Sequence, residues 1–295
     1  MSGTNPPSRA GRNILRGGML VGALVVLGCS SDATGASMTP QRFMQNKPST
    51  LGTLIVDDDW TDLSGWTKLD EVPAGAINAV SDASAPESPP GVLEFKYLNS
   101  TYDGSGAGSM NLDFPSTDEI YVSFVWYASP GFTWADYSNK LLYVGDPAGS
   151  GGDWIIELAH MPNYNGDFFI MANNGSGASP GGGTNMGYPW GLGDGGTNPT
   201  HDGATPRKEI HAGHWYEIEL HLKKGDVGSS LLQLWSRDIT AREAPFKLID
   251  TDQIGMTDHI WDHFQIQSIL GGGFTDISAT VGQYYHIDQI TAYQP

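Results

Sequence analysis

Apolar and polar residues alternate along most of this chain, and no long stretch repeats with the 3.6-residue period of a helix. The clearest case is residues 215–223 (WYEIELHLK). Its apolar side is Tyr216, Ile218, Leu220 and Leu222, and its polar side is Glu217, Glu219, His221 and Lys223. Successive side chains of a strand point to opposite faces of a sheet, so this segment is predicted to be a strand with one buried face.

Similar patterns predict strands over residues 120–127, 231–237, 263–270 and 284–293. Gly (39) and Pro (18) make up about a fifth of the 295 residues and gather in turn-like clusters between these segments. Such a composition is typical of turn-rich all-β proteins. We therefore expect residues 53–295 to form one antiparallel β-sandwich, with residues 29–52, which are polar and small, as a flexible tether before it.

The N-terminal 28 residues have the pattern of a secretory signal peptide. Three arginines and no acidic residue precede the apolar run 19–27 (MLVGALVVL), and Gly28 precedes the single cysteine, Cys29. Nine apolar residues are too few to span a bilayer as a helix, which favours a signal peptide over a membrane anchor. One cysteine also excludes an internal disulfide and a multi-cysteine metal site.

The segment Val26-Leu27-Gly28-Cys29 resembles the lipobox of bacterial lipoproteins. The resemblance implies that Cys29 becomes the lipidated first residue of the mature chain and ties it to a lipid bilayer. Ser30 after the cysteine is similar to the outer-membrane sorting pattern of Gram-negative bacteria, so the cell envelope is the expected location. The alternative is an ordinary buried cysteine close to a signal anchor.

Charge limits the classes of partner. With 15 Lys plus Arg against 33 Asp plus Glu, the formal net charge is −18. Removing residues 1–28 takes away three arginines and no acid, which leaves 12 cations, 33 anions and a charge of −21. Nucleic-acid binding needs a concentrated basic face, so we do not expect this protein to bind nucleic acid. The same acidity weighs against acidic polysaccharides as ligands.

Residues 173–206 form a segment of 34 residues with 11 glycines and no strand pattern. Loops of this length inside a compact domain are uncommon and are often functional. Tyr188 and Trp190 lie within it and are candidate sugar-binding residues, because an aromatic face matches the apolar face of a pyranose. Equally, the two rings fit a role in pinning the loop to the domain.

Several segments together resemble the concanavalin A-like lectin/glucanase superfamily, and in particular its polysaccharide-lyase-like members. In chain order they are 56–60 (VDDDW), 63–66 (LSGW), 129–134 (SPGFTW), 139–145 (NKLLYVG), 213–219 (GHWYEIE), 234–235 (LW) and 285–290 (YHIDQI). The resemblance covers about residues 53–295 and implies a two-sheet antiparallel jelly-roll sandwich. Its members include lectins, glucanases, lyases and inert binding modules, so the activity stays open.

The chain departs from the family's catalytic motifs. The E-x-D-x-E strand of the retaining glucanases is absent, and Glu217-Ile218-Glu219 is the nearest segment. The Arg-rich strand and Gln-x-His motif of alginate lyases are also absent, since Gln267 stands where the histidine would be. No standard family assignment follows from the sequence.

Two enzymatic hypotheses use the polar strand faces. Glu217 and Glu219 are ~7 Å apart along a strand and are candidates to divide acid and base roles in glycoside hydrolysis, unless they lie on a solvated outer face. A lyase needs a Tyr or His base and groups that neutralise a uronate carboxylate. The candidates for catalysis are Glu217, His221, Tyr284 and His286, and those for substrate binding are Arg237, Gln265 and Gln267.

A calcium site is the one cofactor that the sequence suggests. Asp57 and Asp58 lie near the start of the predicted domain and Asp288 near its end. Oxygen ligands from the first and last strands fit a structural Ca²⁺ that ties the two ends together, while the alternative is a solvated acidic turn.

Three functions remain: polysaccharide binding without turnover, polysaccharide cleavage (by a lyase before a hydrolase), and a structural lipoprotein that packs on protein partners in the envelope.

Overall fold

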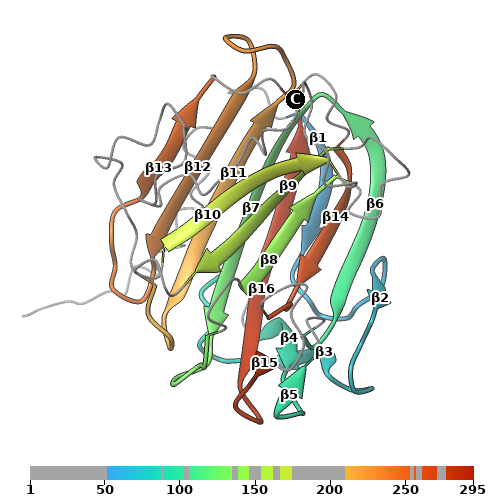
Figure 1. The fold of residues 1–295 in the computed structure, drawn as a ribbon, viewed down its shortest axis with the longest axis vertical. Helices are drawn as coiled ribbons and strands as arrows, with labels where there is room; N and C mark the ends of the chain where they lie inside the picture. The colour runs from blue at the N-terminus through green and yellow to red at the C-terminus, as the bar shows by residue number, and fades with distance from the viewer. Residues whose placement is uncertain are drawn as a thin grey trace, which may run out of the picture. The chain divides into compact units, whose positions relative to one another are not determined.

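The computed structural model describes residues 52–87, 90–102, 106–134, 139–145, 154–161, 167–174, 210–252, 256, 261–270 and 277–295. All regular elements in these ranges are β-strands, and they pair antiparallel throughout (Figure 1). Within the same ranges there is no helix long and apolar enough to cross a membrane.

The larger sheet has eight strands. Its order is β13 (Phe246–Thr251), β12 (Leu231–Asp238), β11 (Trp215–Lys223), β7 (Glu119–Ala128), β16 (Tyr284–Gln294), β4 (Gly91–Lys96) and β3 (Ile77–Ser81), with β1 (Thr53–Asp58) also paired to β16. The first and last strands of the domain are thus hydrogen-bonded neighbours, as in a jelly roll, where chain ends meet in one sheet.

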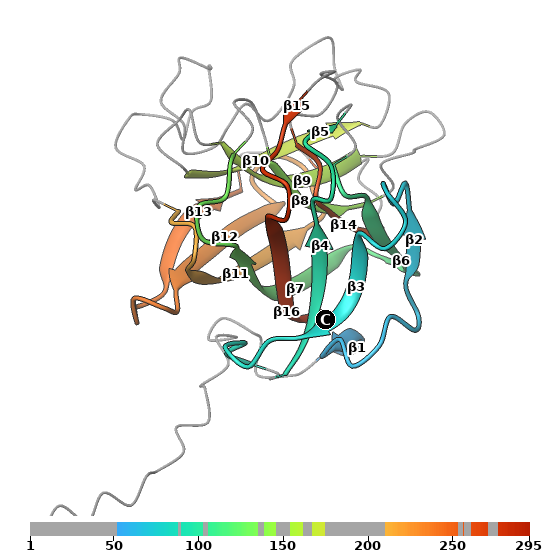
Figure 2. The same ribbon diagram turned by 90° about the horizontal axis from the view of Figure 1, so that it is seen from below.

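The second sheet has six strands, in the order β10 (Asp167–Asn174), β9 (Trp154–Met161), β8 (Asn139–Val144), β14 (Trp261–Gln267), β6 (Ser109–Thr117) and β2 (Thr67–Leu69). A short pair, β5 (Thr101–Tyr102) with β15 (Ile277–Ser278), stands apart from both. The two large sheets lie as layers over one another (Figure 2). The all-β, two-sheet sandwich predicted from the sequence is confirmed.

The core lies between the two sheets and follows from the alternation. Tyr216, Ile218 and Leu220 of β11 belong to one buried apolar cluster with Phe264 and Ile266 of β14. Such interdigitation of two inner faces is what stabilises a β-sandwich. The predicted strand over 215–223 matches β11 at both ends. By contrast, β14 begins two residues before the predicted segment 263–270 and ends three residues before its end.

The Gly-rich segment predicted over 173–206 begins slightly too early, because its first two residues are the end of β10. The next described residue after Asn174 is Ile210. Tyr188 and Trp190 therefore lie outside the described residues, as do the signal peptide, Cys29 and the tether up to residue 51.

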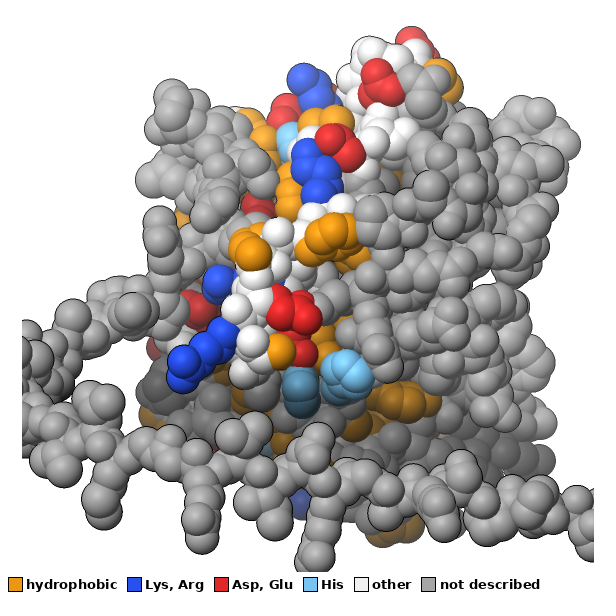
Figure 3. All heavy atoms as spheres, turned by 90° about the vertical axis from the view of Figure 1, so that its left-hand side faces the viewer, with side chains coloured by type: hydrophobic (Ala, Val, Ile, Leu, Met, Phe, Trp, Pro, Cys, Tyr) orange, Lys and Arg blue, Asp and Glu red, His pale blue; other side chains and the backbone are white. Residues whose placement is uncertain are grey.

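Among the described strands, β13 is an edge of the larger sheet, since its one partner there is β12. The view onto this side shows basic and acidic side chains beside one another among apolar ones (Figure 3). Lys247 and Asp250 of β13 form an ion pair of 2.8 Å there. Charged side chains on a sheet edge oppose pairing with strands of other molecules.

Candidate functional site

The residues predicted to form one site lie on the outward faces of two different sheets. Glu217, His221, Arg237, Tyr284 and His286 belong to strands of the eight-stranded sheet, whereas Gln265 and Gln267 belong to β14 in the six-stranded sheet. Both sheets turn their apolar sides toward the shared core, so their polar sides point away from each other. These candidates therefore do not share one face.

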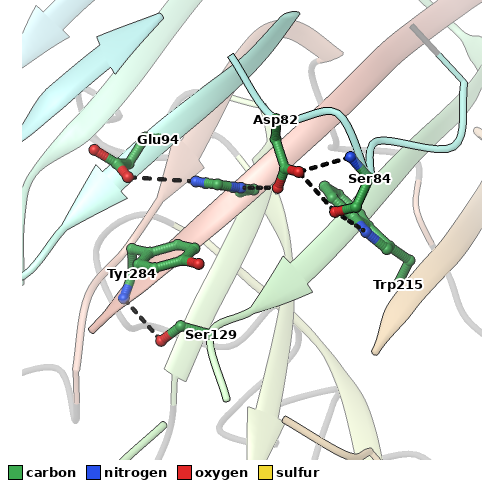
Figure 4. A network of polar contacts seen from close by, with 7 residues as sticks. Asp82, Ser84, Glu94, Ser129, Trp215 and Tyr284 are labelled. Atoms are coloured by element: carbon green, nitrogen blue, oxygen red, sulfur yellow. Dashed lines mark hydrogen bonds and ion pairs between the residues drawn. The ribbon is translucent and has the colours of Figure 1, made fainter. Parts of the chain in front are cut away.

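On the eight-stranded sheet, His286 lies between the carboxylates of Asp82 and Glu94, both of which are labelled in Figure 4. Its Nδ1 lies 2.9 Å from Asp82 and its Nε2 lies 3.3 Å from Glu94. Each ring nitrogen thus faces a carboxylate, a group that accepts hydrogen bonds. The side chain is only 5% exposed. A histidine with both nitrogens occupied in this way is a structural link and not an available base.

That link fastens the connection between β3 and β4, residues 82–87, across the outer face of the sheet. Ser84 Oγ accepts from Trp215 Nε1 at 3.3 Å and donates to Asp82 at 2.6 Å (Figure 4). The Glu87 amide donates to Asp288 at 2.6 Å. Ala85 packs into a second apolar cluster with Trp215 and neighbouring valines. This part of the face is therefore covered by the chain itself.

Replacing Ser84 with Ala should lower the free energy of unfolding by about 1 kcal/mol, because it removes the hydroxyl that joins Trp215 to Asp82. Urea unfolding of both proteins measures the difference. Ser229→Ala is the matched control, because Ser229 lies in an exposed turn and should change stability by less than about 0.5 kcal/mol. Equal effects of the two substitutions would contradict a fastening role for Ser84.

The carboxylates of β11 are also buried and engaged. Glu217 forms an ion pair of 2.5 Å with Arg237, its cross-strand neighbour on β12. Glu219 is 2% exposed, and burial, followed by the charge of Glu217, raises the pKa of Glu219 to about 8. Neither group is presented to a polymer in solution, so the hydrolytic pair proposed from the sequence does not lie in an open site.

His221 on the same face resembles His286 in its contacts. Its Nε2 lies 2.9 Å from Glu119 and its Nδ1 lies 3.0 Å from the Gln233 side chain. The Tyr121 ring stacks on it at 3.8 Å between centroids. The ring is thus fixed on both edges and one face, and the catalytic role predicted for His221 has no support in its surroundings.

The six-stranded sheet presents a different outer face. Tyr143 of β8 stands opposite Gln265 of β14, and Gln265 stands opposite Asn111 of β6. Lys140 Nζ donates to the Tyr143 hydroxyl oxygen. Directly opposed side chains in an antiparallel pair are ~5 Å apart. A phenol with an ammonium beside it and two carboxamides thus form one row across three strands.

Two further rows flank this one along the strands. On one side, Gln267 Nε2 donates to Gln265 Oε1, and Gln265 Nε2 donates to Ser109 Oγ at 3.3 Å. On the other side, His263 Nδ1 lies 2.5 Å from the Asp113 carboxylate, and the two residues are cross-strand neighbours. The hydrogen bond from Gln267 fixes the orientation of the Gln265 carboxamide in the central row.

Unpartnered polar atoms gather on this face. Asn111 Oδ1, Gln267 Oε1 and His263 Nε2 are buried and have no hydrogen-bond partner in the described part of the chain. Buried polar atoms in native proteins are almost always hydrogen-bonded, so orphans of this kind indicate a missing partner. Three of them on adjacent rows mark this face as the candidate site.

Sequence reasoning found Gln265 and Gln267 but missed Lys140, Tyr143, Asn111 and His263. The segment NKLLYVG was singled out for its family likeness, and its Lys and Tyr are the residues now placed at the site. The sequence does not show that β8 pairs with β14, and this pairing brings together residues more than a hundred positions apart.

The aspartates predicted to bind calcium have hydrogen-bond partners of their own. Asp57 accepts from Gln289 at 2.6 Å, and Asp58 accepts from Trp66 Nε1 at 2.8 Å. Asp288 accepts from the Glu87 amide. Among the described residues, no three His, Cys, Asp or Glu side chains are grouped closely enough to hold a metal. A structural Ca²⁺ stays a prediction, to be tested by comparing melting temperatures in calcium and in chelator.

No protein-family model matches this sequence, and no curated protein matches it. Solved structures do match. An endo-β-1,4-glucuronan lyase from Trichoderma reesei superposes with a TM-score of 0.56 at 15% identity, covering 82% of this chain and 96% of that one. The alginate lyase Aly36B, as a mutant in complex with an alginate trisaccharide, gives 0.53 at 13% identity, covering 83% and 100%.

A marine alginate lyase from Aplysia kurodai superposes with a TM-score of 0.51 at 13% identity, covering 75% of this chain and 87% of that one. At such identities the likeness concerns the fold alone. The fold is the concanavalin A-like jelly roll that the sequence motifs implied.

Proposed function

We propose that this domain binds a uronic-acid polysaccharide on the outer face of its six-stranded sheet and cleaves it by β-elimination. The observation that carries the proposal is the central row, in which the Lys140 ammonium donates to the Tyr143 phenol and Tyr143 stands opposite the Gln265 carboxamide. The fold that the chain shares with polysaccharide lyases supports it as an analogy.

β-Elimination at a uronate needs a base, an acid and groups that hold the uronate carboxylate. The C5 proton must leave to a base while its electron pair forms the C4=C5 double bond, and the C4–O4 bond then breaks. The leaving O4 must receive a proton. Tyr143 suits this last task, because a phenol can give a proton and the Lys140 ammonium that donates to its oxygen stabilises the phenolate left behind.

The third requirement is a group that holds the uronate carboxylate, on which negative charge develops when the C5 proton leaves. A carboxamide has two N–H donors. Gln265 uses one of them on Ser109, and its orientation is fixed because its oxygen accepts from Gln267. The other N–H and the neighbouring Asn111 carboxamide are suited to the substrate carboxylate.

The net charge of −18 opposes the approach of an acidic polymer. That repulsion is screened beyond about 8 Å at physiological ionic strength, so the short-range donors of the central row decide whether a uronate is held. Binding without turnover, and binding of neutral glycans, are the competing outcomes.

Incubation of the purified protein with a panel of polyuronates and neutral glucans tests the proposal. We expect ultraviolet absorbance from the unsaturated uronate product with at least one polyuronate and no reducing ends from neutral glucans. Retardation in gels that contain a polysaccharide, without any product, would replace the proposal with binding alone. Neither product nor retardation, together with co-purification of a membrane complex, would favour the structural lipoprotein.

We also propose that Cys29 is lipidated and that the domain is held at the outer membrane of a bacterial cell envelope, on the sequence pattern of residues 1–30 alone. In a Gram-negative host, Cys29→Ala should abolish incorporation of labelled palmitate and move the protein from the membrane fraction to the soluble fraction. Ser31→Ala is the matched control and should leave both unchanged. Labelling of the Cys29→Ala protein would overturn this proposal.

A further inference from the structure

We propose that His263, oriented by Asp113, is the base that removes the C5 proton in the reaction proposed above. The inference rests on the proposed function, since it assigns the one role that the central row leaves unfilled.

His263 lies on the same outward face as Gln265. The two residues are two positions apart on β14, which places their side chains ~7 Å apart along the strand. Tyr143 is directly opposite Gln265, so His263 and Tyr143 stand on diagonal positions around the carboxamide. A sugar ring held by its carboxylate at Gln265 would have the phenol on one side and the imidazole on another.

The hydrogen bond to Asp113 fixes which nitrogen is basic. His263 Nδ1 lies 2.5 Å from the Asp113 carboxylate, and a carboxylate only accepts, so Nδ1 carries the proton. In the neutral ring the lone pair is then on Nε2, which is buried and has no partner in the described part of the chain. An imidazole oriented by a carboxylate, with the lone pair of its other nitrogen not engaged by any described residue, is the arrangement of a general base.

Two histidines on strands of the eight-stranded sheet, His221 and His286, differ from His263 in their contacts. His221 and His286 each have acceptors at both ring nitrogens. His263 has one acceptor, at Nδ1, and its side chain is 12% exposed. The charged and titratable groups on the strands around it are Asp113 of β6, Asp262 of β14, and Lys140 and Tyr143 of β8.

Two groups, His263 and Tyr143, account for both proton transfers. His263 Nε2 takes the C5 proton, the electron pair forms the C4=C5 bond, the C4–O4 bond breaks, and Tyr143 gives its proton to O4. The imidazolium then loses a proton and the phenolate regains one through solvent. The net result is one unsaturated uronate end and one free hydroxyl, and no oxidant or other reactant is consumed.

The test measures kcat/KM against pH for cleavage of whichever polyuronate the wild-type protein degrades. His263→Gln should lower kcat about 100-fold and remove the fall of kcat/KM on the acid side, where the base becomes protonated. Asp113→Ala is the second variant. Its side chain is 90% exposed, so the fold should survive, and we expect a smaller loss, about tenfold, with a displaced acid limb.

His214→Gln is the matched control, because His214 Nδ1 also contacts an aspartate, Asp238, at 2.6 Å, but in the eight-stranded sheet. It should keep both the rate and the pH profile. If the wild-type protein cleaves a polyuronate and His263→Gln and Asp113→Ala both keep its pH profile and its rate within threefold, this inference is wrong and the proposed function stands. If the wild-type protein cleaves no polyuronate, the proposed function fails first.

Discussion

Replacing Tyr143 with Phe should reduce the cleavage of polyuronate about 1,000-fold in kcat while leaving the fold intact. The substitution removes one oxygen atom, which carries the proton proposed for the leaving O4 and accepts a hydrogen bond from Lys140. The ring itself is kept. Because the loss concerns a proton that is transferred only in the transition state, KM should change far less than kcat.

The measurement is the initial rate of appearance of the unsaturated product, together with the thermal unfolding midpoint of each protein. Tyr121→Phe is the matched control, since Tyr121 lies on the outer face of the other sheet, stacked on His221. It should leave the rate unchanged. A Tyr143→Phe protein with a rate close to that of the wild type would exclude Tyr143 as the acid and move the site elsewhere.

The fold was predictable because it depends on a local pattern. In β11, residues two positions apart are both apolar or both polar. The sequence alone therefore separates Ile218 and Leu220, which lie in the core, from Glu217 and Glu219, which lie outside it. The strand ends were less predictable. Strand β14 begins at Trp261, which is buried in the core, and the regular alternation starts two residues later, at His263. A shift of register with β6 separates Trp261 from His263.

The site was not predictable from the same pattern. Alternation shows that Gln265 and His221 each lie on the polar side of a strand, but it does not show to which sheet each strand belongs. That depends on pairings between distant segments, such as Tyr143 with Gln265 and Gln265 with Asn111. The sequence therefore indicated candidate residue types but not which of them share a face.

The polar side of β11 also has a character that periodicity does not foresee. It was expected to be either a catalytic row or a solvated face, and the structure shows a buried polar layer instead. Glu217 stands opposite Arg237 and His221 opposite Gln233, so cross-strand partners satisfy these groups while their long side chains cover one another. Glu219 is the exception, because its Oε2 is buried and has no hydrogen-bond partner among the residues that the structure describes.

Replacing Glu219 with Gln should stabilise the domain at alkaline pH. The pKa of Glu219 is raised from 4.5 to about 8, first by burial and then by the charge of Glu217. Each pKa unit corresponds to about 1.4 kcal/mol, so ionising this carboxyl in the folded state costs up to about 5 kcal/mol. Because a folded protein relaxes and admits water around a buried charge, we expect about 2 to 4 kcal/mol from the substitution above pH 8.

The sign follows from proton binding. Between pH 4.5 and about 8 the folded protein holds the Glu219 proton and the unfolded chain does not, so the contribution of this group to stability falls as pH rises through that window. Gln resembles the protonated carboxyl at every pH. Urea unfolding at pH 4.5 should therefore show a small difference between Glu219→Gln and the wild type, and unfolding at pH 9 the full one.

Asp118→Asn provides the control, since its side chain is 84% exposed and should alter stability little at either pH. A constant difference between Glu219→Gln and the wild type from pH 4.5 to 9 would mean that the effect comes from packing and not from ionisation. A rising difference would show that β11 keeps a protonated carboxyl inside its polar layer at neutral pH. That result would also explain why Glu217 and Glu219 do not act as an exposed hydrolytic pair, since one is held by Arg237 and the other lacks a charge.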